Sequence, residues 1–129
     1  MIGHRPAVPD DIKSVIHIIK CGCKELLVED EFIEKLLYSH NTGIPLCIKV
    51  GLDPTAPDIH LGHTIILGKL RQLQDLGHKV IFLVGDFTAL IGDPSGRKTA
   101  RPMLTHEEIL KNADTYCRQA SLILDTFRV

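Results

Sequence analysis

Residues 51–63 read GLDPTAPDIHLGH, and this stretch decides the fold. A short apolar run, residues 46–50, precedes it, and apolar residues with helical spacing follow from Leu61 to Leu76. Proline, aspartate and glycine, which favour turns, fill the space between the two. The sequence therefore predicts a strand, a turn-rich loop and a helix, with His60 and His63 at the N-terminal end of that helix.

A second strand is expected soon after the helix. Residues 80–84 (VIFLV) form an unbroken β-branched and aromatic run, which is typical of a strand covered on both faces in a parallel sheet. Gly77 is suited to end the helix before it. We expect Ile66, Leu70 and Leu73 to form the buried face of the helix. Strand, helix and strand with short connections form a right-handed βαβ unit, so the predicted fold class is α/β, a parallel sheet with flanking helices.

Further helices are expected on either side of this unit. An apolar stripe over residues 12–19 follows a start signal at residues 9–11, and a second helix is expected over residues 31–38. Residues 105–108 (THEE) have the spacing of a capping box and open a helix. The apolar side of this last helix carries Ile109, Ala113, Tyr116, Ala120 and Ile123.

The composition is that of an ordinary globular domain, with 44% hydrophobic and 24% charged residues. Fifteen basic and 16 acidic side chains give a formal net charge of −1, so no basic excess marks the chain as a nucleic-acid-binding domain. No apolar run has the length of a membrane span, and the N-terminal residues lack the apolar segment of a signal peptide. We therefore expect a cytoplasmic protein, in which the four cysteines are reduced thiols.

The two histidines stand where an open parallel sheet binds its ligands, beyond the carboxyl end of a strand. A helix N-terminus carries unpaired N–H groups and about half a positive charge, which attract phosphate. His60 and His63 are about one helical turn apart, so both imidazoles can donate to one ligand. Gly51 and Gly62 let a ligand approach the backbone closely. This pattern is suited to a nucleoside triphosphate.

Two other interpretations of the histidines are possible. A metal site is disfavoured, because only two histidines are local and the zinc-binding helix pattern spaces its histidines by four residues around a glutamate. No metal ligands are expected. A purely structural role, in which each ring caps or fills a turn, suits a lone histidine better than two histidines on either side of a glycine.

A second candidate site is the loop after the second strand, residues 85–101 (GDFTALIGDPSGRKTAR). Arg97, Lys98 and Arg101 bring three positive charges together after a sharp turn. The loop is not a Walker phosphate loop, because Arg97 stands where that motif needs glycine. Two interpretations stay possible: a basic loop that is only solvated, and a loop that contacts phosphate. Asp93 in this loop is suited to accept a hydrogen bond from an ammonium group, or to form the turn before proline.

Together these residues resemble the class I aminoacyl-tRNA synthetases, and within them the bacterial tyrosyl-tRNA synthetases. Residues 60–63 (HLGH) look like the HIGH signature, residues 51–56 (GLDPTA) like the run upstream of it, and residues 92–96 (GDPSG) like the loop that follows. Several nucleotidyltransferases share HxGH, but the three elements in this order are far more specific. The resemblance covers residues 25–124.

The resemblance implies a Rossmann-like parallel sheet with flanking helices, the nucleotide-binding half that carries the HIGH signature. N-terminal helices precede it: residues 1–43 would be a helical segment, and residues 44–129 the first half of an ATP-binding catalytic domain. The implied reaction of the full-length form is ATP-dependent activation of tyrosine to tyrosyl-adenylate and transfer to tRNA(Tyr). ATP would be a substrate accompanied by Mg²⁺, with no tightly bound cofactor, and the full-length form would be a homodimer. The 129 residues alone are expected to be inactive, because the KMSKS loop is not among them.

The resemblance also implies roles for individual residues, which act by positioning and by neutralising charge on the phosphates. Thr55 and His60 would contact the departing phosphates, and His63 the ribose and α-phosphate end. Arg97 and Arg101 would close over pyrophosphate. The residues implied to bind ATP and tyrosine are Gly51, Asp53, Gly62, Leu83, Thr88 and Asp93, of which Asp93 would bind the ammonium group and Leu83 and Thr88 would line the tyrosine pocket.

Two alternative functions stay open at this point. A small HxGH nucleotidyltransferase would be complete at this length. A non-catalytic nucleotide-binding module would tolerate replacement of His60 and His63 without loss of ligand affinity. One departure from the family pattern bears on specificity: Lys49 stands where many bacterial tyrosine enzymes have a tyrosine that reads the substrate hydroxyl.

Overall fold

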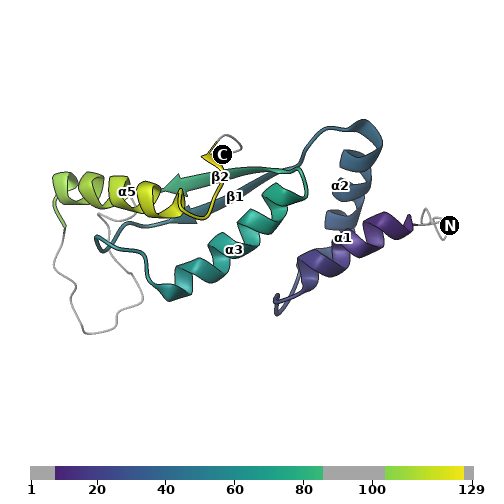
Figure 1. The fold of residues 1–129 in the computed structure, drawn as a ribbon, viewed down its shortest axis with the longest axis horizontal. Helices are drawn as coiled ribbons and strands as arrows, with labels where there is room; N and C mark the ends of the chain where they lie inside the picture. Colours follow the sequence, from purple (N-terminus) through teal and green to yellow (C-terminus); the bar gives the residue numbers. More distant parts are fainter. Residues whose placement is uncertain (1–7, 86–103, 127–129) are drawn as a thin grey trace.

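The computed structural model describes residues 8–85 and 104–126. Its helices and strands are, in chain order, α1 (Asp10–Lys20), α2 (Glu29–Thr42), β1 (Cys47–Leu52), α3 (Leu61–Asp75), β2 (Lys79–Val84) and α5 (His106–Ala120) (Figure 1). The two strands pair in parallel, in a register that runs from Cys47 opposite Lys79 to Leu52 opposite Val84. The predicted α/β class, with two helices before the β–α–β unit, is confirmed.

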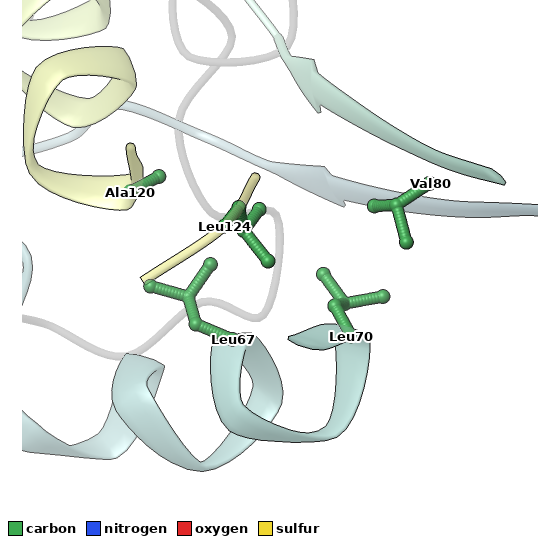
Figure 2. Close-up of a cluster of buried hydrophobic side chains, with 5 residues drawn as sticks. All are labelled: Leu67, Leu70, Val80, Ala120 and Leu124. Atoms are coloured by element: carbon green, nitrogen blue, oxygen red, sulfur yellow. The ribbon is translucent and has the colours of Figure 1, made fainter. Parts of the chain in front are cut away.

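The main hydrophobic core lies between α3, β2 and the end of α5. It is formed by Leu67 and Leu70 from α3, Val80 from β2, and Ala120 and Leu124 at and beyond the end of α5 (Figure 2). Strand residues alternate between the two faces of a sheet. Ile48 and Val50 of β1 and Phe82 of β2 pack against this core from the same face of the sheet as Val80, and α3 and α5 cover that face.

A second cluster joins the N-terminal helices to the rest of the molecule. Ile19 of α1, Leu36 of α2 and Leu73 of α3 are buried together. Lys69 of α3 strengthens this junction, because its Nζ donates to the carbonyl oxygens of Ile19 at 3.2 Å and of Cys21 at 2.7 Å. A positive charge at the last carbonyls of a helix is stabilising. As a result, α1 and α2 pack at the C-terminal end of α3 (Figure 1).

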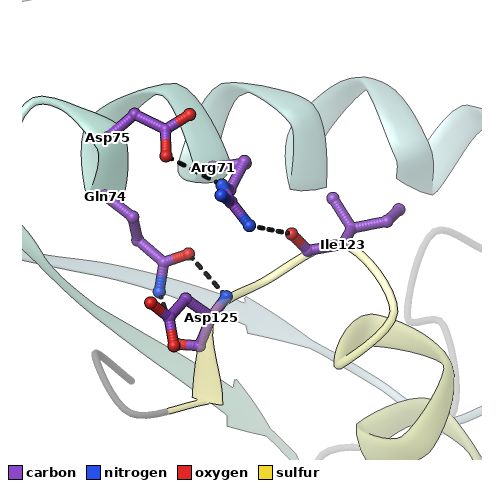
Figure 3. Close-up of polar contacts among 5 residues, drawn as sticks. All are labelled: Arg71, Gln74, Asp75, Ile123 and Asp125. Atoms are coloured by element: carbon purple, nitrogen blue, oxygen red, sulfur yellow. Dashed lines mark hydrogen bonds and ion pairs between the residues drawn. The ribbon is translucent and has the colours of Figure 1, made fainter.

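The segment after α5 is held on α3 by polar side chains (Figure 3). Gln74 is fully buried, and its amide exchanges two hydrogen bonds with the backbone of Asp125: Nε2 donates to the carbonyl oxygen at 3.0 Å, and the Asp125 N–H donates to Oε1 at 2.9 Å. Arg71 donates from Nη1 to the carbonyl oxygen of Ile123 at 3.2 Å. The buried amide of Gln74 thus pairs with both backbone polar groups of Asp125.

Three expectations from the sequence need correction. Ile66 is 41% exposed, and Leu67 takes its place in the core. Ile81 is 43% and Leu83 47% exposed, so within the described residues β2 is covered on one face only. The second helix, expected over residues 31–38, spans Glu29–Thr42 and ends at Gly43, whose φ is +70°. No helix within residues 8–85 and 104–126 has both the length and the apolar character needed to cross a membrane.

Candidate functional site

The candidate site begins where β1 and β2 end. Gly51 and Leu83 are partners in the strand register, so these two predicted site residues lie side by side. A Cβ atom on Gly51 would stand 3.9 Å from Leu83 Cδ2, which is an ordinary contact. The two residues share the exposed face of the sheet, opposite the main core. The carboxyl ends of both strands are thus brought to one edge, as the sequence predicts.

The loop between β1 and α3 turns sharply at Pro54. The N–H group of Thr55 donates to the carbonyl oxygen of Asp53 at 2.9 Å, and Pro54 between them is buried. Asp53 and Thr55 are exposed on either side of it. Burial of the proline therefore holds the carboxylate and the hydroxyl at the surface, between the strand ends and the histidines.

His60 and His63 cap α3 reciprocally. His60 is the N-cap residue, and its Nδ1 accepts a hydrogen bond from the Gly62 N–H at 3.1 Å. In return, the N–H of His60 donates to Nδ1 of His63 at 3.1 Å. The ring centroids are 4.0 Å apart. This is the arrangement of a capping box, in which the usual serine or threonine and glutamate are replaced by two imidazoles.

The caps fix which ring nitrogen of each histidine can meet a ligand. A nitrogen that accepts a hydrogen bond carries no proton, so each neutral ring bears its proton on Nε2. The network assigns this tautomer to both histidines. The first turn of α3 contains no acidic residue, so no carboxylate there offsets the positive end of the helix dipole. The site therefore offers hydrogen-bond donors and the positive end of a helix dipole, which suit an anion.

Packing within the chain gives a more specific reason for glycine at position 62 than the approach of a ligand does. A Cβ atom at this position would lie 2.8 Å from Cε1 and 3.0 Å from Nδ1 of the His60 ring. Any other residue would push the ring aside and weaken the cap. The packing of the His60 ring over the backbone at position 62 thus favours glycine within the HxGH motif.

α5 supplies residues that sequence reasoning missed. Asn112 is buried, and its Nδ2 donates to the carbonyl oxygen of Pro54 at 3.1 Å. Gln119 contacts the same loop further along. Tyr116, predicted as a core residue, is buried and meets the ring of His63 in an edge-on arrangement with centroids 5.8 Å apart. The one feature of the sequence that could have pointed to these contacts is the amide of Asn112, which lies on the apolar side of the predicted helix.

The N-terminus of α5 forms the predicted capping box. The Thr105 N–H donates to Glu108 Oε2 at 2.8 Å, and the Glu108 N–H donates to Thr105 Oγ1 at 3.2 Å. The hydrogen bonds from the Thr105 backbone and then from its hydroxyl lower the pKa of the Glu108 carboxyl below its usual value. The start of the helix that backs the loop is therefore well defined.

The other predicted site residues fall outside the described part of the chain: Thr88, Asp93, Arg97 and Arg101. Among the described residues, no three histidine, cysteine, aspartate or glutamate side chains come together as a metal site would require. The structure thus brings together Gly51 and Leu83 at the strand ends, and His60, Gly62 and His63 at the helix N-terminus.

A parallel strand–loop–helix unit with an HxGH corner at the helix N-terminus is the arrangement that the resemblance to class I aminoacyl-tRNA synthetases predicts for their nucleotide-binding half. A family model described as "tRNA synthetases class I (W and Y)" matches residues 41–129. The chain belongs to this family.

Its relatives narrow the class further. The chain is 62% identical to the tyrosine–tRNA ligase of Cupriavidus pinatubonensis, and 63% identical to those of Bordetella avium and Burkholderia thailandensis, each over 123 residues. These matches cover 94–95% of this chain and 30% of each relative. The chain thus spans somewhat less than a third of the length of these enzymes.

A solved structure supports the same assignment. The fold is similar to that of a C-terminally truncated mitochondrial tyrosyl-tRNA synthetase from Aspergillus nidulans, with a TM-score of 0.53 and 27% sequence identity. The match covers 87% of this chain and 34% of that one.

Proposed function

We propose that this chain is the N-terminal, ATP-binding part of a tyrosine–tRNA ligase. The complete enzyme would join tyrosine to ATP, releasing pyrophosphate, and then pass the tyrosyl group to tRNA(Tyr). The reciprocal cap of His60 and His63 is the observation that carries this proposal, because it reserves the Nε2–H group of each ring for an anionic ligand. Sequence identity above 60% with tyrosine–tRNA ligases supports the choice of amino acid.

The chemistry asks little of a general base. A tyrosine carboxylate is already a competent nucleophile towards the α-phosphorus of ATP, so catalysis consists of positioning the reactants and stabilising charge on the phosphates. His60 and Thr55 would contact the departing pyrophosphate, and His63 the α-phosphate end. Gly51, Asp53, Gly62 and Leu83 would line the ATP and tyrosine site. Mg²⁺ would arrive with the triphosphate as part of the substrate.

The rest of the assignment completes the proposal. Residues 1–43 would form a helical segment, and residues 44–129 the first half of the catalytic domain, a division close to the start of the family match at residue 41. Thr88, Asp93, Arg97 and Arg101 would contribute to the same site. The full-length enzyme would act as a cytoplasmic homodimer.

The test is tyrosine-dependent exchange between ATP and pyrophosphate in the full-length protein that carries these residues. His60→Asn keeps a side-chain oxygen to accept the Gly62 N–H, but it lacks the Nε2 donor. Loss of one such donor costs on the order of 3 kcal/mol of transition-state stabilisation, so the activation rate should fall roughly 100-fold with the KM for tyrosine little changed. His17→Asn, at an exposed position of α1, is the matched control.

Three results would contradict the proposal. Equal losses in activation rate and in tyrosine affinity for His60→Asn would contradict the assignment of His60 to the phosphate site. ATP–pyrophosphate exchange that is stimulated by another amino acid, but not by tyrosine, would show that tyrosine is not the substrate. Transfer of an adenylyl group to a phosphorylated acceptor instead would favour the nucleotidyltransferase alternative.

A further inference from the structure

The loop that carries the site has little support of its own. It runs from Asp53 to His60 between β1 and α3, and it forms no regular secondary structure. A loop of this kind needs partners for its backbone groups wherever they are shielded from water. Two of those groups, the carbonyl of Pro54 and the N–H of Ile59, are paired with side chains from a distant helix, α5.

Three residues of α5 make these contacts from one side of the helix. Asn112, Tyr116 and Gln119 follow the i, i+4, i+7 spacing that places side chains on a common face. Asn112 Nδ2 donates to the Pro54 carbonyl at 3.1 Å, within the buried interior. The edge of the Tyr116 ring meets the His63 ring, with centroids 5.8 Å apart.

Gln119 uses both ends of its amide. Its Oε1 accepts from the Ile59 N–H at 2.8 Å, and its Nε2 donates to Asp58 Oδ1 at 2.6 Å. The Ile59 peptide immediately precedes His60, whose own N–H donates to His63 Nδ1. Gln119 therefore fixes the Ile59 N–H group, and the adjacent His60 N–H group is the one that bonds to the second histidine of the cap.

We propose that Asn112, Tyr116 and Gln119 are positioning residues for the HxGH corner. None of them needs to touch ATP. They hold the loop at its two ends and the second histidine at its ring, while Ile109 and Ala120 of the same helix are buried in the interior. Displacement of a reacting group by about 1 Å can cost about 100-fold in rate, so loosening this support should slow activation without removing a ligand contact. This inference rests on the proposed function for its kinetic readout.

The decisive variants exploit the two ends of Gln119. Gln119→Glu can still accept from the Ile59 N–H, but it places a second carboxylate against Asp58. Adding Asp58→Asn reverses the pair, since an asparagine amide at 58 can donate to a glutamate at 119. Gln119→Met, neutral and of similar length, removes both hydrogen bonds and serves if the charged variant folds poorly. Arg118→Gln is the control, because it breaks only the exposed pair with Asp114 on the same helix.

Two measurements are made on the full-length protein and each variant. The first is the kinetics of tyrosine-dependent ATP–pyrophosphate exchange. Gln119→Glu and Gln119→Met should lower kcat about 10-fold or more with the KM for tyrosine within about twofold. Asp58→Asn combined with Gln119→Glu should recover most of the rate, and Arg118→Gln should match the parent protein.

The second measurement is backbone hydrogen exchange, which does not depend on activity. The amides of Ile59, His60 and Gly62 should exchange faster in Gln119→Glu and Gln119→Met, while amides in the middle of α3 keep their protection. A merely structural role would change protection throughout the domain, and that result would overturn the inference. Unchanged kcat together with unchanged protection of these three amides would also overturn it.

The two proposals fail in different ways. A parent protein without tyrosine-dependent ATP–pyrophosphate exchange would refute the proposed function. The backbone hydrogen-exchange comparison would still decide whether Gln119 holds the HxGH corner. If the parent protein catalyses ATP–pyrophosphate exchange normally, and no Gln119 variant changes either kcat or amide protection, the positioning role alone is refuted.

Discussion

His60 assigns one task to each of its ring nitrogens. Nδ1 of His60 caps the helix, which leaves Nε2 as the donor that we propose for a ligand, and His63 repeats the arrangement with the backbone of His60. A serine or aspartate would cap a helix as well, but neither would present an outward donor of this reach. Histidine at both positions therefore satisfies the helix N-terminus and leaves the site able to hold phosphate.

His78, at a different junction, makes a prediction about pH. The ring is buried between the end of α3 and the start of β1, and its Nδ1 accepts from the Leu46 N–H at 3.4 Å. Burial lowers the pKa of His78 below its usual value, because a charged ring would lose its hydration. The unfolded chain thus binds the proton more readily than the folded protein.

The sign of the pH effect follows from that difference. The contribution of His78 to the free energy of unfolding should be complete above the unfolded pKa, about 6.5, and should be lost as the pH falls below it towards the folded pKa. His78→Asn retains an acceptor and should flatten this part of the profile. Urea unfolding of the full-length protein between about pH 7 and pH 5 measures it, and an identical slope in the variant would contradict the assignment.

At the scale of single elements, periodicity in the sequence predicted which elements form better than which faces they bury. The helices and strands appear where the apolar spacing and the turn residues place them, and the capping box at Thr105 has the expected hydrogen bonds. Three apolar residues in succession, Ile65, Ile66 and Leu67, left the buried face of α3 open to error. Helical spacing predicted Leu70 and Leu73 correctly, but it does not choose among these three residues, and packing against β2 selects Leu67.

The support from α5 could not be predicted in the same way. The partners of Asn112 and Gln119 are backbone groups 58 and 60 positions away in the sequence. A pattern of residue types shows that an amide lies on the apolar side of a helix, but it does not show which loop that amide meets. The roles implied for Gly51 and Leu83 stay predictions, although the strand register does place the two residues together.

Gln74 provides a test of how α3 holds the segment that follows α5. Replacing it with methionine keeps the volume and removes both hydrogen bonds to the Asp125 backbone (Figure 3). Loss of partners for buried polar groups costs about 1–3 kcal/mol, so the Tm of the full-length protein should fall by about 1–3 °C. Arg118→Gln is the control, since it breaks only the exposed pair with Asp114 on α5. Equal Tm values for both variants would contradict this account of the segment.

At the scale of the whole molecule, the described residues cover one face of the sheet and leave the other face exposed. α3 and α5 pack on the first face, while Ile81 and Leu83 are exposed on the second. Strands of this apolar composition are typical of parallel sheets covered on both faces. The chain spans 30% of the length of its relatives, so the site should be tested in the full-length protein.

The most direct test of the central claim is calorimetric binding of a non-hydrolysable tyrosyl-adenylate analogue to the full-length protein. We expect it to bind in preference to the tryptophanyl and leucyl analogues. His63→Asn keeps an acceptor for the His60 N–H but lacks Nε2, and it should weaken binding about 10-fold or more, since a hydrogen bond to a charged group contributes about 1.5–3 kcal/mol. Equal affinity for the three analogues, or unchanged affinity in His63→Asn, would contradict the claim that this corner holds the phosphate of tyrosyl-adenylate.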